Sequence, residues 1–217
     1  MTDPRSPTTA AQLYDAIGET YEAAFGQQQP GLTRALDLLV SALPPRARVL
    51  DLGSGTGRPV AATVAAAGHT VTGYDVSQRM VQFAQAHVPG ATFEVNDMRS
   101  LNFDGDSWDA VLTVFSLLQL SHADQLEMLT RISRWLAPGG YVLVATVPHP
   151  AGCPGRESEW MGHRVRTYSF PALALKAHLV QTGLQILHDE VVAFVPNNDK
   201  ANAEEQVYLI ARKPEVA

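Results

Sequence analysis

The chain has 217 residues, of which 46% are hydrophobic and 18% charged, and this ordinary globular composition excludes a disordered, collagen-like or coiled-coil protein. Its formal net charge of −6 argues against a binder of nucleic acid or of anionic membranes, since such proteins usually present a basic face. The single cysteine, Cys153, excludes an internal disulfide and fits a reducing compartment. The length favours one domain. Because no segment resembles a membrane span or a signal peptide, we expect a cytoplasmic protein without membrane insertion.

Two helices are predicted in the N-terminal part of the chain. A threonine can cap the first, over residues 10–25, and its apolar positions share one face. A break at residues 27–31 precedes the second helix, over residues 32–43, which stops before two prolines.

Further along, short apolar runs alternate with amphipathic segments. Strands are expected at residues 48–52, 71–75, 91–95, 109–115 and 141–147, and helices at residues 59–67, 77–87 and 123–136. We expect the last of these helices to end at Pro138-Gly139-Gly140. This alternation is typical of βαβ units, which form a parallel sheet covered by helices on both faces.

The pattern changes again after residue 147. Residues 148–168 are rich in Pro, Gly, His and Arg and show no clear period, and long loops in compact domains are often functional. A helix over residues 170–182 and strands at residues 184–194 and 205–211 complete the chain. The last two strands can pair as an antiparallel hairpin, although the loop between them is long.

The strongest motif is V-L-D-L-G-S-G-T-G at residues 49–57, where the first predicted strand meets a helix. Its glycines permit a tight turn and let a ligand approach the amide donors of the helix N-terminus. The spacing is G-x-G-x-G instead of the dinucleotide fingerprint G-x-G-x-x-G, and one glycine loop is weak evidence by itself.

Two acidic residues follow neighbouring strands. Asp75 ends the second strand, where a carboxylate can accept hydrogen bonds from both hydroxyls of a ribose. It could instead cap the next helix, but Ser77 is the better cap. Asp97 follows the third strand and can accept the amine of an adenine, or be an ordinary loop residue. These features lie at the carboxyl ends of parallel strands, where open α/β sheets bind ligands.

Together the motifs resemble those of the class I S-adenosylmethionine-dependent methyltransferases, in the branch of quinone-biosynthesis and natural-product enzymes. D-A-V-L-T-V-F at residues 109–115 and L-A-P-G-G at residues 136–140 match further motifs of this family. The resemblance covers residues 46–147 well and the rest of the chain more loosely.

The resemblance implies an α/β fold, a Rossmann-like three-layer sandwich. Its mostly parallel seven-stranded sheet would have the order 3-2-1-4-5-7-6, with the seventh strand antiparallel, beneath an N-terminal helical lid. The single domain would divide into the lid (1–45), a cofactor-binding core (46–147), an acceptor cover with a helix (148–183) and C-terminal strands (184–217).

The implied cofactor is S-adenosyl-L-methionine, with S-adenosyl-L-homocysteine as the product. By resemblance, the cofactor-binding residues are Tyr14, Tyr21, Asp51, Gly53, Ser54, Gly55, Gly57, Asp75, Val76, Met80, Asp97, Met98 and Phe115. The glycines would face the amino-acid part of the cofactor, and Phe115 would lie near its methyl group. Met80 could equally be a core residue, and the two tyrosines could be ordinary helix packing.

The acceptor is less well defined. Methyl transfer is an in-line displacement, so a base is needed only if the acceptor must lose a proton. The candidate catalytic residues are His149, His163 and Tyr21, although a histidine here could also be a packing or surface residue. The expected acceptor pocket contains Leu118, Leu120, Trp160 and Tyr168. An apolar pocket suits a neutral small molecule, whereas Arg156, Arg164 or Arg166 could bind a carboxylate.

Two other functions stay open. One is a non-catalytic S-adenosylmethionine-binding regulatory or partner subunit. The other is a nicotinamide oxidoreductase, which the glycine spacing and the lack of a Tyr-x-x-x-Lys pair disfavour. The fourth strand is followed by V-F-S-L at residues 114–117 and not by the Asn/Asp-Pro-Pro-aromatic motif of nucleobase methyltransferases. We therefore expect a small-molecule acceptor, no nucleic-acid partner and no metal. Neither the methylated atom nor the oligomeric state follows from the sequence.

Overall fold

A computed structural model of the chain describes residues 9–18, 20–25, 29–196 and 203–215. The helices are α1 (Ala10–Ile17), α2 (Thr20–Phe25), α3 (Pro30–Ala42), α4 (Val60–Ala66), α5 (Gln78–His87), α6 (His122–Trp135) and α7 (Ala172–Gln181), with 3₁₀ turns η1 (Met98–Ser100) and η2 (Leu117–Gln119). The strands are β1 (Arg48–Leu52), β2 (Thr70–Asp75), β3 (Thr92–Val95), β4 (Trp108–Val114), β5 (Leu136–Thr146), β6 (Arg156–Trp160), β7 (His163–Thr167), β8 (Gln185–Phe194) and β9 (Glu204–Arg212).

Seven strands form one sheet in the order β3-β2-β1-β4-β5-β9-β8. The pairs among β1 to β5 are parallel, whereas β9 runs antiparallel to both β5 and β8. The predicted order 3-2-1-4-5-7-6 describes this sheet when β8 and β9 are counted as its sixth and seventh strands, because β6 and β7 form a separate two-stranded sheet. The predicted fold class is confirmed.

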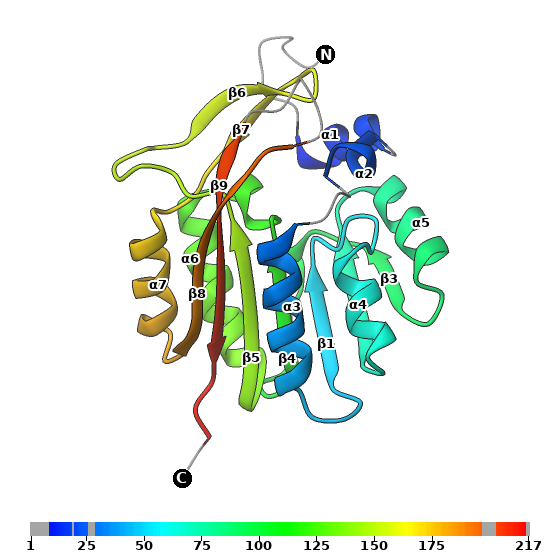
Figure 1. Ribbon diagram of the computed structural model, residues 1–217, viewed down its shortest axis with the longest axis vertical. Coiled ribbons are helices and arrows are strands. Elements are labelled where there is room, and N and C mark those ends of the chain that lie inside the picture. Colours follow the sequence, from blue (N-terminus) through cyan, green and yellow to red (C-terminus); the bar gives the residue numbers. More distant parts are fainter. Residues whose placement is uncertain (1–8, 19, 26–28, 197–202, 216–217) are drawn as a thin grey trace.

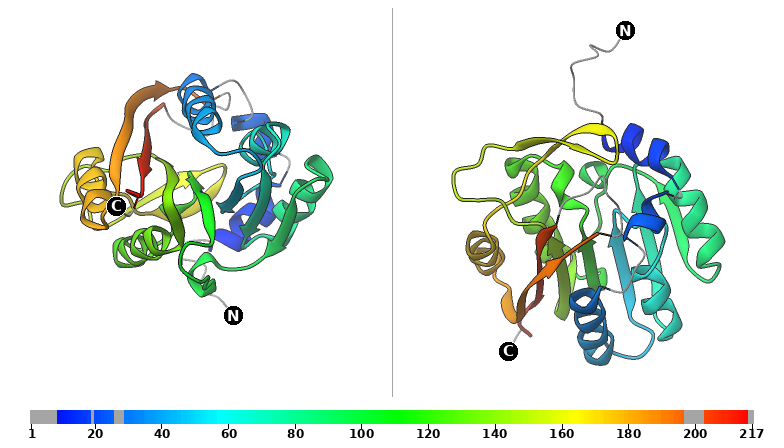
Figure 2. Two further views of the ribbon diagram at one scale, coloured as in Figure 1. Left: turned by 90° about the horizontal axis from the view of Figure 1, so that it is seen from below. Right: turned by 45° about the horizontal axis from the view of Figure 1, so that its top comes forward.

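Helices cover both faces of the sheet, as Figures 1 and 2 show. On one face α3, α4 and α5 pack over a core that includes Val49 and Leu112. On the other, α6 and α7 pack over a core that includes Leu50 and Val111. Neighbouring residues of one strand therefore enter opposite cores, which explains why the central strands read as continuous apolar runs.

The predicted single helix over residues 10–25 is wrong, because Gly18 ends α1 in a conformation with φ 45° and ψ −125°. The helix predicted from residue 32 begins earlier, at Pro30. Proline is well tolerated there because the first turn of a helix lacks amide partners in any case.

The third core helix, predicted over residues 123–136, agrees with α6 to within one residue, but the strand after it begins earlier than the predicted residue 141. Helix α6 ends at Trp135, and β5 starts directly at Leu136, which pairs with Trp108. Regular pairing resumes only at Tyr141, so the Pro-Gly-Gly segment forms an irregularity within β5.

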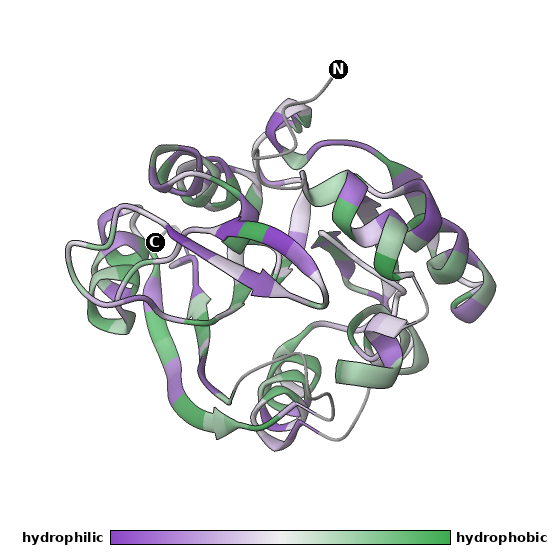
Figure 3. Ribbon diagram, turned by 90° about the horizontal axis from the view of Figure 1, so that it is seen from above, coloured by the Kyte–Doolittle hydropathy of each residue, from purple (hydrophilic) through white to green (hydrophobic). Residues whose placement is uncertain are grey.

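Residues 148–168, which show no clear period in the sequence, contain the β6–β7 hairpin. Met161 and Gly162 form its turn with φ angles of 53° and 77°, the positive values that a two-residue hairpin turn with right-handed strand twist requires. The hairpin crosses above the sheet next to α1 and α2 (Figure 1), and most of its length is hydrophilic (Figure 3).

The N-terminal helices are attached to the sheet domain by apolar and polar contacts. Leu13 and Ile17 of α1 form a small core with Met80 and Val165. Asp15 accepts a 2.6 Å hydrogen bond from the Ser77 hydroxyl at the start of α5.

Helix α2 is attached at the glycine turn. Glu22 accepts a 2.8 Å hydrogen bond from the Thr56 hydroxyl. The two helices thus lie over the carboxyl ends of the strands, in the position expected of a lid.

Candidate active site

Three cavities meet at the carboxyl ends of the parallel strands. The aromatic cavity, of about 240 Å³, lies beneath the β6–β7 hairpin and includes Phe25, His149 and Trp160 in its lining. The Asp75 cavity, of about 450 Å³, runs along the ends of β2 and β3, and the glycine-turn cavity, of about 60 Å³, lies at the start of α4. Tyr21 and Phe115 line all three cavities.

The glycine turn combines a close backbone approach with an open surface. The amide groups of Gly53 and Ser54 both donate to the Tyr74 carbonyl, at 2.7 and 3.0 Å. A Cβ at Gly53 would lie 2.3 Å from that of Ser116, so no side chain fits there. A Cβ at Gly55 would meet nothing within 4 Å, and this residue faces two cavities.

Gly57 serves a different purpose from the other two glycines. It lines none of the three cavities, and its φ is 77°. A Cβ there would lie 3.2 Å from the Ala84 Cα and 3.1 Å from Val88, so this glycine lets the turn pack closely on α5.

Asp75 is the carboxylate that closes the turn. One oxygen accepts the Gly55 amide and the other the Ser77 amide, both at 2.9 Å. Ser77 itself caps α5, so Asp75 is not the helix cap. Burial raises the pKa of Asp75, while the amide donors oppose that shift. Each carboxylate oxygen can accept another hydrogen bond, which leaves capacity for ribose hydroxyls.

Two buried polar atoms beside the glycine turn lack partners. Asp51 Oδ2 and Ser54 Oγ have no hydrogen-bond partner among the described residues, and both residues line the glycine-turn cavity. Burial, followed by the nearby Asp75, raises the pKa of Asp51 to about 7. An unpartnered buried carboxylate is costly unless a ligand supplies a donor or a positive charge. This corner therefore fits an ammonium group such as that of S-adenosylmethionine.

The far end of the Asp75 cavity is lined by the residues that the sequence predicts to contact the adenine of the cofactor. Val76 and Met98 form apolar wall, and Met80 is fully buried yet also lines the cavity. Asp97 caps η1 and pairs with the Arg99 guanidinium at 2.6 Å, which lowers its pKa. An adenine amine would share this carboxylate with Arg99.

Phe115 lies where the cavities meet, directly after β4. Its φ of 54° is rare for a residue other than glycine, and its amide donates to the Ala145 carbonyl at 2.8 Å. The ring packs edge-on against Tyr208, with centroids 6.0 Å apart. Strained backbone of this kind is often found at functional sites.

Helices α1 and α2 contribute Tyr14 and Tyr21, whose rings lie side by side although they belong to different helices. Their ring centroids are 5.8 Å apart, and Trp160 of the hairpin is 6.3 Å from Tyr14 and 6.4 Å from Tyr21. Burial raises the pKa of both phenols, that of Tyr21 to about 12. Their hydroxyls stay protonated near neutral pH, so neither tyrosine is suited to act as a base.

Of the two candidate histidines, only His149 lines a cavity. Its imidazole lies between Thr167 Oγ1, 3.4 Å from Nε2, and Cys153 Sγ, 3.8 Å from Nδ1. Burial and the nearby Arg156 lower its pKa, so the ring is neutral at pH 7. His163 pairs with Trp160 beside the hairpin turn and lines none of the three cavities.

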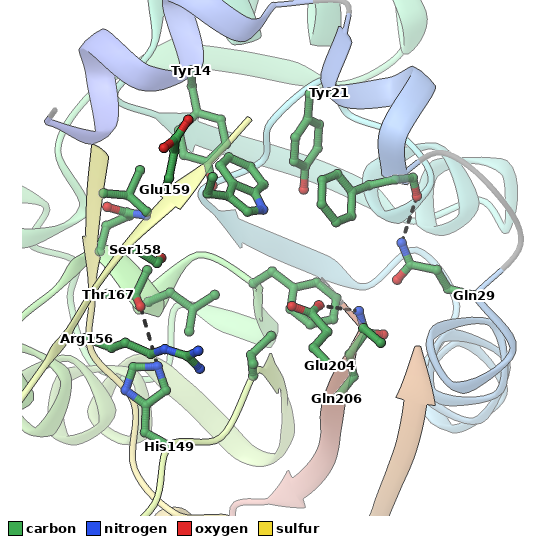
Figure 4. Close-up of a pocket in the computed structure, with 18 residues that line it drawn as sticks. Tyr14, Tyr21, Gln29, His149, Arg156, Ser158, Glu159, Thr167, Glu204 and Gln206 are labelled. Carbon is green, nitrogen blue, oxygen red and sulfur yellow. Dashed lines mark hydrogen bonds between the residues drawn. The ribbon is translucent and has the colours of Figure 1, made fainter. Parts of the chain in front are cut away.

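The remaining predicted residues divide between two cavities. Leu118 and Trp160 line the aromatic cavity, whereas Leu120 and Tyr168 line the Asp75 cavity. The prediction missed several polar and aromatic residues of the aromatic cavity, namely Phe25, Gln29, Thr167, Glu204 and Gln206, most of which Figure 4 shows. The alternation R-x-S-x-W at residues 156–160 could have revealed the inner face of the hairpin. Gln29 and Glu204 belong to no motif.

Two further observations concern the described part of the chain. It contains no cluster of three or more His, Cys, Asp or Glu side chains able to hold a metal ion. None of its helices has both the length and the apolar character needed to cross a membrane.

The sheet order, the open glycine turn and the carboxylates at the ends of β1 and β2 define a Rossmann-like protein with the cofactor site of a methyltransferase. The family described as "Methyltransferase domain" matches residues 49–140. Over this region and beyond it, the chain is similar to S-adenosylmethionine-dependent methyltransferases of class I.

Among its relatives is the 27-O-demethylrifamycin SV methyltransferase of Amycolatopsis mediterranei, 28% identical over 85% of this chain and 76% of that protein. The demethylmenaquinone methyltransferase of Renibacterium salmoninarum is 30% identical over 70% of this chain and 64% of that protein, just under two thirds of its length. Among solved structures, the Burkholderia thailandensis 1,6-didemethyltoxoflavin-N1-methyltransferase superimposes with a TM-score of 0.67 at 21% identity, over 99% and 98% of the two chains. That likeness concerns the fold.

Proposed function

We propose that the protein transfers the methyl group of S-adenosylmethionine to a small-molecule acceptor bound in the aromatic cavity. The observation that carries this proposal is the convergence of the three cavities on Tyr21 and Phe115. A cofactor in two of them and an acceptor in the third would meet at these two side chains. The two relatives are named for small molecules, a demethylrifamycin and a demethylmenaquinone.

The residues that would hold the cofactor follow from the contacts above. Asp75 offers free lone pairs to ribose hydroxyls, Val76 and Met98 offer apolar surface to adenine, and Asp51 offers a carboxylate to the ammonium group. When bound, S-adenosylmethionine supplies a methyl group on a positively charged sulfur. The division into lid, core, acceptor cover and C-terminal strands belongs to the same proposal.

This chain's contribution to the rate is positioning and the exclusion of water, which suffice for much of the acceleration of a displacement at an activated methyl group. Tyr14 and Tyr21 from the lid and Trp160 from the hairpin close the cavities with aromatic surface. For a hydroxyl or thiol acceptor, the neutral imidazole of His149 is our candidate base.

The two alternatives are less favoured. A non-catalytic binding subunit has no need for a second cavity that opens onto the cofactor cavities at Tyr21 and Phe115. A nicotinamide oxidoreductase would place a pyrophosphate at the glycine turn, where the buried carboxylate of Asp51 instead favours a cation.

A direct assay tests the proposal. The protein is incubated with methyl-labelled S-adenosylmethionine and a panel of small aromatic and aliphatic alcohols, thiols and amines, and label transfer is measured. We expect transfer to one chemical class and its loss in Phe115→Ala. Binding of S-adenosylhomocysteine without transfer to any compound would favour the regulatory subunit.

A further inference from the structure

The aromatic cavity is lined by Arg156, whose guanidinium forms no ion pair or hydrogen bond with a side chain of the described residues. Arg156, Ser158 and Trp160 are alternate residues of β6, and all three line the cavity. Across the hairpin Arg156 pairs with Thr167, whose hydroxyl contacts His149. Figure 4 shows Arg156, Ser158, Thr167 and His149 on one side of the cavity, with Arg156 reaching into it.

The other two arginines of the hairpin, unlike Arg156, lie close to a carboxylate. Arg164 forms a 2.7 Å ion pair with Glu157, and Arg166 lies 4.0 Å from the same carboxylate. No side chain within the described ranges forms an ion pair or a hydrogen bond with Arg156, although it lines the cavity with Glu159 and Glu204. Glu204 instead accepts a hydrogen bond from Gln206 at 3.0 Å. The cavity therefore offers a free guanidinium to a ligand.

The opposite side of the cavity offers hydrogen-bond acceptors. Gln29 is 9% exposed, and its amide nitrogen donates to the Phe25 carbonyl at 2.8 Å. The oxygen of the same amide, Gln29 Oε1, is buried and has no partner in the part of the chain that the structure describes. Since Gln29 lines the aromatic cavity, a ligand with a hydroxyl or amine would satisfy it.

Flat aromatic surface lies between these two polar sides. The rings of Phe25 and Trp160 have centroids 5.5 Å apart and are tilted by only 33°, and Tyr21 stacks on Phe25 with centroids 5.3 Å apart. A planar ring bound against this wall would present one edge to Arg156 and the other to Gln29.

Building on the proposed function, we propose that the acceptor is a hydroxylated aromatic acid. Its carboxylate pairs with the Arg156 guanidinium, its ring lies against Trp160 and Phe25, and a hydroxyl donates a hydrogen bond to Gln29 Oε1. This hydroxyl only anchors the acceptor, because it lies across the cavity from His149; a hydroxyl that His149 deprotonates would be a second one, on the Arg156 side. A guanidinium recognises a carboxylate through two parallel hydrogen bonds, which a neutral amide cannot reproduce. Arg156 is accordingly a specificity-determining residue.

The experiment compares matched acids and amides. The protein saturated with S-adenosylhomocysteine is titrated by calorimetry with a panel of hydroxybenzoates and hydroxynaphthoates and with the corresponding carboxamides. The same titrations are made with Arg156→Met, Arg156→Lys and Gln29→Leu. Arg164→Met is the matched control, because this arginine belongs to the same hairpin and lines none of the three cavities.

We expect at least one acid to bind about tenfold more tightly than its amide, as one charge-assisted pair implies. Arg156→Met should abolish that preference, Arg156→Lys should keep part of it, and Arg164→Met should keep all of it. Gln29→Leu should weaken acid and amide alike.

Three results would overturn the inference: no acid binds, amides bind as tightly as acids, or the preference survives in Arg156→Met. Failure of the proposed function looks different. In that case S-adenosylhomocysteine itself does not bind, or a bound acid never receives the labelled methyl group.

Discussion

Asp75 connects the glycine turn to the start of α5 through its two amide hydrogen bonds, so one carboxylate both shapes the turn and faces the Asp75 cavity. Its removal should affect the site in two ways. The amides of Gly55 and Ser77 lose their acceptor, and a ribose loses a charged partner.

We predict that Asp75→Ala weakens S-adenosylhomocysteine binding by about 2–4 kcal/mol, or about thirty-fold to a thousand-fold. The variant should also lose about 1–3 kcal/mol of folding stability, because buried amides are left unpaired. Asp75→Asn should lose less on both counts, since its amide oxygen still accepts one bond. Titration calorimetry and urea unfolding measure the two effects, and unchanged affinity in folded Asp75→Ala would refute the ribose role.

We expect Asp51 to make the affinity for the cofactor depend on pH. Its pKa of about 7 in the free protein means that part of the population is protonated at neutral pH. A cationic ammonium group favours the ionised form, so binding should release a proton and strengthen as pH rises.

We therefore predict that S-adenosylhomocysteine binds about tenfold more weakly at pH 6 than at pH 8. Calorimetry in buffers of different ionisation enthalpy should detect proton release at pH 6.5. Asp51→Asn, which cannot titrate, serves as the control and should show neither effect. An equally steep pH dependence in Asp51→Asn would exclude this assignment.

If His149 is the base, its protonation should lower the turnover rate at acidic pH. The neutral imidazole is the active form, and its pKa is lowered from 6.5. At saturating cofactor, where the pH dependence of cofactor affinity does not limit the rate, turnover should therefore fall only below pH 6.5 as the ring becomes protonated. His149→Ala should reduce turnover by about a hundredfold and remove this acid limb, with cofactor affinity nearly unchanged. A pH–rate profile with labelled cofactor tests this, and an unaltered profile in the variant would remove His149 from the mechanism.

Helices α1 and α2 and the β6–β7 hairpin are the elements that close the site. The apolar members of the two large cores all lie from Leu32 onward among the described residues, so the sheet does not depend on α1 or α2. The small core beneath α1 does, because it consists of Leu13, Ile17, Met80 and Val165.

We predict that deletion of residues 1–25 leaves the sheet folded but raises the dissociation constant of S-adenosylhomocysteine at least about tenfold and reduces turnover. Loss of the lid uncovers Met80 and removes Tyr14 and Tyr21 from the cavity walls. Circular dichroism and calorimetry measure both effects. Deletion of residues 1–8 alone, which keeps the Thr9 cap of α1, is the control. Normal binding by the longer deletion would disprove the lid.

The sequence predicts a helix or strand well where its local hydrophobic pattern agrees with its surroundings in the folded protein. The strands that enter both cores are continuous apolar runs and were predictable. Gly18 was not recognised as a helix end, because apolar positions continue in register across it. The hairpin escaped detection because its inner face, which lines a cavity, mixes Arg156 and Ser158 with Trp160 and so lacks the apolar alternation of a core-facing strand.

For the whole molecule, the gathering of the glycine turn, Asp75 and Asp97 at one edge of the sheet was predictable, and the lining of the aromatic cavity only in part. The glycine turn, Asp75 and Asp97 follow consecutive strands, so chain order alone places them at one edge of the sheet. Gln29, Arg156 and Glu204 come from the start of α3, from the hairpin and from the start of β9. Only the folded chain brings such distant segments to one cavity.

Calorimetric titration with S-adenosylhomocysteine and, separately, with NAD⁺ tests whether these cavities bind the cofactor of a methyltransferase. Both titrations are made with the wild-type protein and with Asp75→Asn. We predict that S-adenosylhomocysteine binds to one site per chain, that Asp75→Asn weakens this binding, and that NAD⁺ does not bind. Binding of NAD⁺ but not of S-adenosylhomocysteine by the folded protein would contradict the central claim that these cavities form a methyltransferase active site.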